Sequence, residues 1–327
     1  MTELFRRVAL ISAACAAFVL CNPAESLAET WPSRPVTIVV PFTAGTTSDI
    51  IARGLAQDLS QSFGQPFIID NRGGAGGNIG AALVAHATPD GYTILLATTG
   101  QAATNKLMYH NMTFDPERDF VPILLVGKSP IIIVARPDAP FSTLKEFIDY
   151  AKANPDKTTA GFPGNGTLGH ITGEFLQRKA SIKFSYAQYR GSGAILVDLS
   201  GSHIDIAMDS MAAYVPFIEG GKIKALAIAG PNRWSKLPNV PTASESGLPG
   251  FEASVWYALF APTGTPPDVT ARLNAATNEY LRSAKANAFL DNLGVKIAGG
   301  TPDQLKVFTA SELEKWAPII KSANISF

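Results

Sequence analysis

Apolar runs of strand length alternate along the chain with stretches in which apolar residues recur at helical spacing. Residues 36–42 form a mostly apolar run typical of a buried strand, and Ile51, Leu55 and Leu59 follow at i, i+4 and i+8, the spacing of an amphipathic helix. The same patterns predict strands at 66–70, 92–97, 122–126, 131–135, 204–208, 225–229 and 255–261, and helices at 78–86, 143–153, around 168–175, 192–200 and 211–220. This alternation predicts an α/β fold with largely parallel sheets.

The C-terminal part of the chain is predicted to be helical. Thr265 to Asp268 and Thr301 to Gln304 have the form of capping boxes with Pro at the first helical position. Apolar residues then recur at helix-face spacing behind both boxes.

The first 28 residues have the form of a secretory signal peptide. Arg6 and Arg7 precede an apolar run at 8–20, and the small residues Ser26 and Ala28 form a cleavage site. That run is shorter than the roughly 20 residues that span a bilayer. The chain's two cysteines, at 15 and 21, both lie in this segment, so the mature chain is expected to have no disulfide and no thiolate chemistry.

Two turn-rich stretches divide the remaining chain. Gly and Pro are frequent at 127–130 and at 238–250, and the segment between them has the pattern of a separate α/β unit. We therefore predict lobe 1 at 29–125 plus 254–327 and lobe 2 at 126–253. Two chain crossings between lobes produce a hinge with a cleft, where small ligands bind.

Composition and motifs exclude several classes of function. Lys plus Arg and Asp plus Glu both number 27, so nucleic-acid binding is not expected. The four histidines are isolated, which argues against a metal site, and neither a P-loop nor a Gly-x-Ser-x-Gly nucleophile motif is present. No catalytic residue and no metal ligand is predicted.

The densest glycine cluster, at 71–78, follows a strand and precedes a helix. It lacks the third glycine of a dinucleotide-binding motif, and the acid that follows, Asp90, falls in a turn. We interpret the cluster as a tight connection between strand and helix and expect no cofactor.

A strand-to-helix loop at 44–49 is the first candidate for ligand binding. Helix N-termini offer free backbone N–H groups that bind anions, and this loop adds several hydroxyls. Thr46 and Asp49 also have capping-box spacing, so a plain helix cap is an equal alternative, and Asp49 would compete with an anion. The candidates here are Ala44, Gly45, Thr46, Thr47, Ser48 and Asp49.

A second loop of similar chemistry precedes the helix near 168. One such loop in each lobe could close on a ligand from both sides, although turn chemistry alone also explains its glycines. The candidates here are Gly164, Asn165, Gly166, Thr167 and His170. The candidate set is completed by Thr98, Thr99, Tyr189, Arg190, Gly191 and Asp209. Arg190 could instead be a solvated surface charge and Asp209 a helix N-cap.

Several stretches together resemble the periplasmic solute-binding proteins of tripartite tricarboxylate transporters, the Bug or TctC-type receptors. They are 31–42 (WPSRPVTIVVPF), 71–80 (NRGGAGGNIG), 89–93 (PDGYT), 164–167 (GNGT), 189–192 (YRGS), 237–242 (LPNVPT) and 247–251 (GLPGF). The resemblance implies a two-lobed periplasmic-binding-protein fold, type II-like, with the ligand cleft between the lobes. It also implies a non-catalytic, periplasmic protein.

The implied ligand is a small organic acid such as a dicarboxylate, a tricarboxylate or an aromatic carboxylate. The implied partners are the permease subunits of the transporter, and we expect a monomer. In this family the two loops grip a carboxylate, partly through ordered water. The family often has two adjacent glycines in the first loop, whereas this chain has Gly45 and Thr46, which adds a side chain at the carboxylate position.

Two expectations about chemistry follow. The two loops contain no Arg or Lys, so neutral donors must hold the carboxylate, with the Thr167 hydroxyl as one donor. The alternative function is a secreted α/β hydrolytic enzyme acting on a small carboxylated substrate, which the missing nucleophile motifs disfavour.

Overall fold

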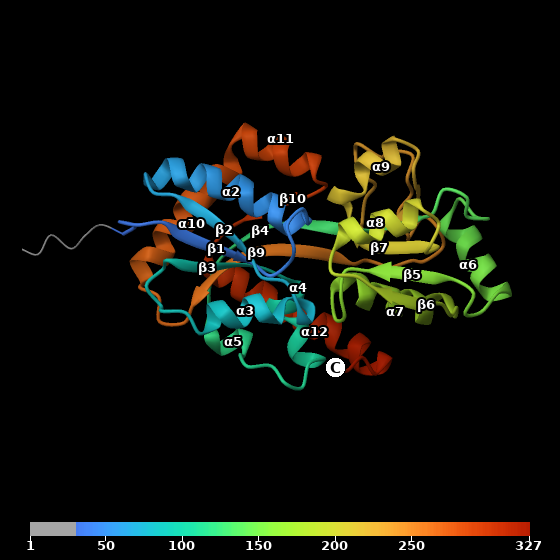
Figure 1. Ribbon diagram of the computed structural model, residues 1–327, viewed down its shortest axis with the longest axis horizontal. Coiled ribbons are helices and arrows are strands. Elements are labelled where there is room, and N and C mark those ends of the chain that lie inside the picture. Colours follow the sequence, from blue (N-terminus) through green and yellow to red (C-terminus); the bar gives the residue numbers. More distant parts are fainter. Residues whose placement is uncertain (1–30) are drawn as a thin grey trace, which may run out of the picture. The chain divides into compact units, whose positions relative to one another are not determined.

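A ten-stranded mixed sheet runs through residues 34–327 of the computed structural model, in the order β2-β1-β3-β9-β4-β7-β5-β6, with β8 and β10 also paired to β4 (Figure 1). The structure describes residues 31–327, so the predicted signal peptide lies outside the described residues. The strands are β1 (Val36–Val40), β2 (Phe67–Asn71), β3 (Thr93–Thr98), β4 (Phe120–Ala135), β5 (Thr159–Phe162), β6 (Ser185–Gln188), β7 (Ile206–Ser210), β8 (Lys224–Ile228), β9 (Ser254–Pro262) and β10 (Lys296–Gly299).

Two parallel groups of strands are joined by antiparallel ones. β1 pairs in parallel with β2 and β3, and β5 pairs in parallel with β6 and β7. Between these groups, β9 and β4 run antiparallel to their neighbours. The α/β class is confirmed, but the expectation of largely parallel sheets is wrong, because the strands that connect the two groups reverse direction.

The long strand β4 corrects a second expectation. The predicted strands at 122–126 and 131–135 are one continuous strand, because Gly127 and Pro130 are accommodated without a break. A Cβ at Gly127 would lie 2.7 Å from the Lys296 carbonyl oxygen, so glycine permits the close approach of β10. The first part of β4 pairs with β9 and β10, and residues 131–135 pair with β7 and β8.

The helices largely follow the predicted spans. They are α2 (Thr47–Phe63), α3 (Asn78–Ala85), α4 (Thr99–Ala102), α5 (Pro116–Asp119), α6 (Leu144–Ala153), α7 (Leu168–Ala180), α8 (Ser192–Ser200), α9 (Val215–Glu219), α10 (Pro267–Arg282), α11 (Ala284–Asn292) and α12 (Pro302–Ala323). Three short 3₁₀ segments are η1 (Ala75–Gly77), η2 (Thr104–Leu107) and η3 (Met211–Ala213), so the helix predicted at 211–220 is divided between η3 and α9.

One of the two predicted C-terminal capping boxes is present. Thr301 accepts from the Gln304 N–H, and the Gln304 side chain accepts from the Thr301 N–H. The predicted capping box at Thr265 is absent, because the Thr265 hydroxyl donates to the Pro262 carbonyl and α10 begins only at Pro267.

Separate apolar cores support the two ends of the sheet. Around β1, β3 and β9 the core includes Val39, Leu95 and Trp256. In the second half of β4, Ile131 and Ile133 enter one core, while the intervening Ile132 enters another on the opposite face, as strand alternation requires. Within the described part of the chain, no helix is long and apolar enough to cross a membrane.

Candidate ligand-binding site

The ends of strands from both parallel groups surround one cavity. Its empty space is about 460 Å³, counting the open solvent at its mouth. It is lined by Phe42, Thr46, Thr47, Ser48, Thr98, Thr99, Pro163, Thr167, Leu168, Gly169, Ser192, Asp209, Ser210, Val255 and Tyr257. This lining contains hydroxyls and one carboxyl but no Lys or Arg.

The first loop turns from β1 into α2 without forming the predicted capping box. The Thr46 hydroxyl donates to the Thr43 carbonyl at 3.0 Å, and the Asp49 carboxylate accepts from the Gly45 N–H at 2.9 Å. Thr46 is still the N-cap residue, but its side chain makes no cap hydrogen bond. The expected plain helix cap is therefore wrong, and the first-turn N–H groups of α2 have no side-chain acceptor from Thr46.

The second loop, from β5 into α7, repeats this geometry. The Thr167 hydroxyl donates to the Gly164 carbonyl at 2.8 Å, and His170 Nδ1 accepts from the Gly166 N–H at 3.2 Å. The N-cap dihedrals also agree, with φ −74° and ψ 161° at Thr46 against φ −65° and ψ 158° at Thr167. A hydroxyl has one proton, so Thr167 cannot donate to a ligand as expected while it keeps this bond.

These two uncapped N-termini differ from those of α6 and α12. There, Thr143 and Thr301 accept from the first-turn N–H groups in complete capping boxes. The N-termini of α2 and α7 instead line the cavity with N–H groups that have no intrahelical partner. Such groups, together with the helix dipole, bind carboxylates without a cation.

Asp49 does not compete for that position, because its carboxylate is already bound. Arg53 donates to it from Nε and Nη2, each at 3.0 Å, one turn along α2. Burial would raise the pKa of Asp49, but the hydrogen bonds from Arg53 and Gly45 outweigh it and the pKa lies below its ordinary value. Asp49 is thus ionised, its charge is balanced by Arg53, and its bond to Gly45 fixes the loop.

His170 plays the matching part in the second loop. Its ring stacks on Phe162 with centroids 4.5 Å apart and meets the edge of Tyr186 at 5.1 Å. Burial in this aromatic setting lowers the pKa of His170 to about 4. The neutral ring keeps Nδ1 free to accept from Gly166.

We expect the stability of the His170→Gln variant to depend less on pH than that of the unmodified protein. The pKa of His170 is about 4 in the folded protein, against 6.5 for a free histidine. Protonation below pH 6.5 therefore favours the unfolded chain. The free energy of unfolding is highest above pH 6.5 and falls by about 3 kcal/mol as the pH decreases toward 4. Glutamine offers an acceptor for Gly166 but does not titrate. Urea unfolding of both proteins at pH 7.5 and 4.5 measures this, and an equal pH dependence in the two would contradict it.

A buried carboxyl lies at the carboxyl end of β7. Asp209 accepts from the Ser192 hydroxyl at 2.6 Å, from the Ser210 N–H at 2.7 Å and from the Tyr214 hydroxyl at 3.3 Å. Burial raises the pKa of Asp209 against these hydrogen bonds. The alternative that Asp209 is a helix N-cap is wrong, because Ser210 occupies that position before η3.

Tyr257, on β9, lines the cavity and was missed by the sequence analysis. Its side chain is fully buried, and its hydroxyl makes no well-formed hydrogen bond within the described residues, although the hydroxyls of Ser210 and Thr47 lie beside it and oppose the rise in its pKa that burial causes. Buried phenols normally find a partner, so this hydroxyl is a candidate donor for a ligand. The sequence signal that could have indicated it is the one tyrosine in the apolar run at 255–261.

Three hydrogen bonds join residues in the range 43–109 to residues in the range 165–210, and the first of them is between two residues that line the cavity. Thr47 Oγ1 and Ser210 Oγ are 3.0 Å apart, and the Tyr109 hydroxyl donates to the Asn165 carbonyl at 2.7 Å. The Thr43 hydroxyl reaches the Arg190 carbonyl at 3.4 Å. The strand ends are therefore held close together in this structure.

The predicted site residues fall into three groups. Those that line the cavity are Thr46, Thr47, Ser48, Thr98, Thr99, Thr167 and Asp209. Those that line an adjacent hollow are Gly164, Tyr189 and Arg190. Those that line neither and shape the loops are Ala44, Gly45, Asp49, Asn165, Gly166, His170 and Gly191. The lining residues that were not predicted are Phe42, Pro163, Leu168, Gly169, Ser192, Ser210, Val255 and Tyr257.

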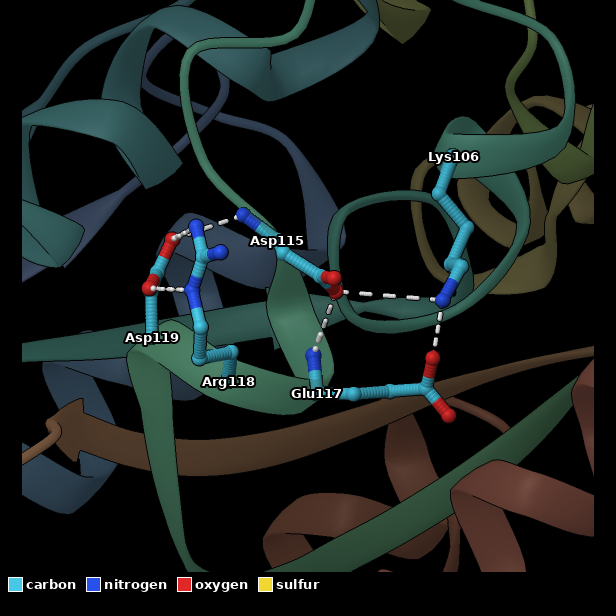
Figure 2. Close-up of polar contacts among 5 residues, drawn as sticks. All are labelled: Lys106, Asp115, Glu117, Arg118 and Asp119. Carbon is cyan, nitrogen blue, oxygen red and sulfur yellow. Dashed lines mark hydrogen bonds and ion pairs between the residues drawn. The ribbon is translucent and has the colours of Figure 1, made fainter.

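A larger hollow of about 1050 Å³ lies beside α5 and α12 and is a weaker candidate. Three of its charged lining residues are engaged in ion pairs, as Figure 2 shows for Lys106 with Glu117 and for Arg118 with Asp119. Asp115 caps α5 by accepting from the Glu117 N–H at 3.1 Å. These charges fix α5 and do not converge on a common point.

A two-lobed α/β fold, with a cavity of hydroxyls and helix N-termini at its strand ends, defines a solute-binding protein. The chain belongs to the TctC family, since residues 51–325 match the family described as tripartite tricarboxylate transporter family receptor. Members of this family are periplasmic receptors, so the resemblance found in the sequence is confirmed.

Individual relatives agree with this assignment. The chain is 34% identical to BugT of Bordetella pertussis over 298 residues, 91% of each chain. It is 35% identical to Rpa4515 of R. palustris, solved with adipate, with a TM-score of 0.88 over 90% of this chain and 99% of that one. For MatC of Rhodopseudomonas palustris with bound malate, the identity is 33% and the TM-score 0.84 over 89% and 100%.

Proposed function

We propose that this protein captures a small organic acid by its carboxylate and delivers it to the permease subunits of a tripartite tricarboxylate-type transporter. The observation that carries the proposal is the pair of uncapped helix N-termini, at Thr46 and Thr167, lining one cavity without a cation. The adipate and malate bound by two relatives support the same ligand class.

The carboxylate is held by neutral donors, as expected from the sequence. Backbone N–H groups of α2 and α7 and the Tyr257 hydroxyl are the donors, and each such bond to a charged group contributes roughly 1.5–3 kcal/mol. Because the donors come from both loops, they act together only when the lobes are closed. Ligand binding therefore favours closure, since the closed state makes contacts that the open state lacks.

The lobe boundaries and the signal peptide are part of the proposal. The change of β4 partners near residue 130 and the start of β9 at Ser254 support lobe 1 at 29–125 plus 254–327 and lobe 2 at 126–253. Residues 1–28 would direct export and be removed from the mature protein, which agrees with a family of periplasmic receptors.

We infer that the protein is a receptor and not a hydrolase. Ser192 and Ser210 both bond the Asp209 carboxyl in the cavity, and each hydroxyl donates its proton directly to that carboxyl. No histidine is among the described lining residues, so neither serine has the imidazole base of a hydrolytic triad.

Calorimetric titration with malate, adipate and benzoate, each beside its neutral amide, tests the proposal. We expect at least one acid to bind and its amide to bind far more weakly, because the amide has no charge for the helix N-termini to stabilise. Amides that bind as tightly as their acids, or steady hydrolysis of the corresponding esters, would overturn it.

The Tyr257→Phe variant should bind the acid about tenfold more weakly, the loss of one hydrogen bond to a charged group. Its fold should change little, because the ring stays buried and the hydroxyl makes no well-formed hydrogen bond among the described residues. Tyr150→Phe, outside the cavity lining, is the matched control. Unchanged affinity in Tyr257→Phe would mean that the hydroxyl does not contact the ligand.

A further inference from the structure

We propose that Tyr109 is a positioning residue for ligand binding. It holds the second loop, residues 164–170, in the conformation that lines the main cavity, and Phe327 in turn holds Tyr109 in place. This inference rests on the proposed function, because it concerns the same site. Neither aromatic residue lines the cavity, so both act through the loop.

The Tyr109 side chain lies directly against the second loop. Its hydroxyl donates to the Asn165 carbonyl at 2.7 Å. A Cβ at Gly166 would lie 3.0 Å from Cε2 of the tyrosine, so glycine at this position lets the ring approach the loop backbone. Gly166 is also the residue whose N–H donates to His170. The tyrosine therefore supports the loop at two consecutive residues.

The loop segment that Tyr109 supports leads directly into the wall of the cavity. Thr167, Leu168 and Gly169 line the cavity and form the N-cap and the start of α7, whose free N–H groups are the proposed donors. Hydrogen bonds weaken steeply when the donor is turned away from its acceptor, so a displaced loop would weaken all of these bonds together. Fixing the loop before the ligand arrives therefore strengthens binding.

Two backbone hydrogen bonds from Phe327 flank Tyr109. The Phe327 N–H donates to the Met108 carbonyl at 2.8 Å, and the Phe327 carbonyl accepts from the His110 N–H at 3.1 Å. The rings of Phe327 and Tyr109 also pack together, with centroids 5.2 Å apart. Beside them, Ser326 Oγ and His110 Nε2 are 2.6 Å apart. Both the backbone and the ring of Tyr109 are thus fixed by residues far away in the sequence.

Phe327 also reaches the second loop itself. Its ring centroid lies 5.8 Å from that of His170, the residue that accepts from the Gly166 N–H. The chain arrives there by a turn after α12, in which Asn324 has a φ of 51°. The next residue, Ile325, is buried in an apolar core that also contains Leu168. The position of Phe327 is therefore anchored.

Hydrogen–deuterium exchange of the unliganded protein, followed by mass spectrometry, tests whether Tyr109 holds the loop. In Tyr109→Phe we expect amide exchange across 164–170 to be about fivefold faster, the effect of losing one neutral hydrogen bond. Exchange should also be faster in Phe327→Ala, which loses the ring contacts with Tyr109 and His170. The first loop, 44–49, is an internal control, because general destabilisation would speed exchange in both loops.

Calorimetry with malate, adipate and benzoate measures the consequence for binding. Each acid that binds the unmodified protein should bind Tyr109→Phe about fivefold more weakly. The double variant with Phe327→Ala should lose less affinity than the sum of the two single losses, because both changes act on the same loop. Phe175→Ala is the matched control, since this half-buried ring on α7 stacks on Phe251 and not on the loop. It should leave affinity and loop exchange unchanged.

Other results would overturn the inference and remain distinguishable from failure of the proposed function. Unchanged exchange across 164–170 in Tyr109→Phe, or equal acceleration in both loops, would show that Tyr109 does not hold the second loop. Faster exchange with unchanged affinity would show that the support does not serve the ligand. If no acid binds the unmodified protein, the proposed function fails, while the exchange results still decide whether Tyr109 holds the loop.

Discussion

Gly76→Ala is expected to weaken ligand binding at least a hundredfold. A Cβ at this position would lie 2.7 Å from the Asn165 carbonyl oxygen and 2.7 Å from the Tyr109 hydroxyl oxygen. These two atoms form one of the hydrogen bonds that join residues 43–109 to residues 165–210. The added methyl therefore opposes the closed arrangement, and a loss of about 3 kcal/mol in closure corresponds to a hundredfold in affinity.

Alanine at this position also destabilises the fold through its backbone conformation, and a control must separate this effect from the effect on binding. Gly76 has a φ of 62°, where alanine is destabilised by about 1 kcal/mol. Gly64 provides the match, because its φ is 67° and a Cβ there would meet no atom within 4 Å. Gly64→Ala should lose similar stability in urea unfolding but bind the acid normally. Equal binding by both variants would show that Gly76 has no role in closure.

Asp49→Ala is expected to destabilise the protein by about 2–3 kcal/mol and to abolish measurable binding. The buried carboxylate holds the Gly45 N–H and neutralises Arg53. Its removal takes the acceptor from the Gly45 N–H and frees the loop from which the first-turn N–H groups of α2 are presented. Urea unfolding and calorimetry measure the two effects.

The pair Lys145 and Asp149 is the matched control. It has the same i, i+4 spacing on a helix, but both side chains are largely exposed. Asp149→Ala should change stability little, because exposed ion pairs contribute little, and should not affect binding. If Asp49→Ala behaves like Asp149→Ala, the carboxylate does not organise the first loop.

Local patterns predicted most of the fold. Periodicity located α8 at its observed bounds and placed β1 and β3 within two residues, whereas α2 extends four residues beyond the periodic positions 51–59 at each end. The short strands β5, β6 and β10 were missed, since four residues are too few for a periodic signal. The continuity of β4 was also missed, because it depends on how β10 packs against Gly127, a contact far away in sequence.

The candidate site was predicted by position more than by role. The sequence identified both loops, but Asp49 and His170 turn out to hold Gly45 and Gly166 in place and do not line the cavity. Spacing alone cannot distinguish a capping box from this arrangement, since both place an acceptor three residues after a threonine. Tyr257 was missed because a cavity-lining residue in a buried strand has the same sequence pattern as a core residue.

The absence of a lining cation in the main cavity, as far as the described residues go, bears on how the protein meets its surroundings. Attraction between mobile ions and exposed charges weakens as salt is added, but fixed N–H dipoles inside a closed cavity are screened far less. With 27 basic and 27 acidic residues, the chain also has no net charge to draw anions from a distance. The affinity for the ligand's carboxylate should therefore be nearly the same at low and at high salt concentration, as suits a receptor outside the cytoplasmic membrane.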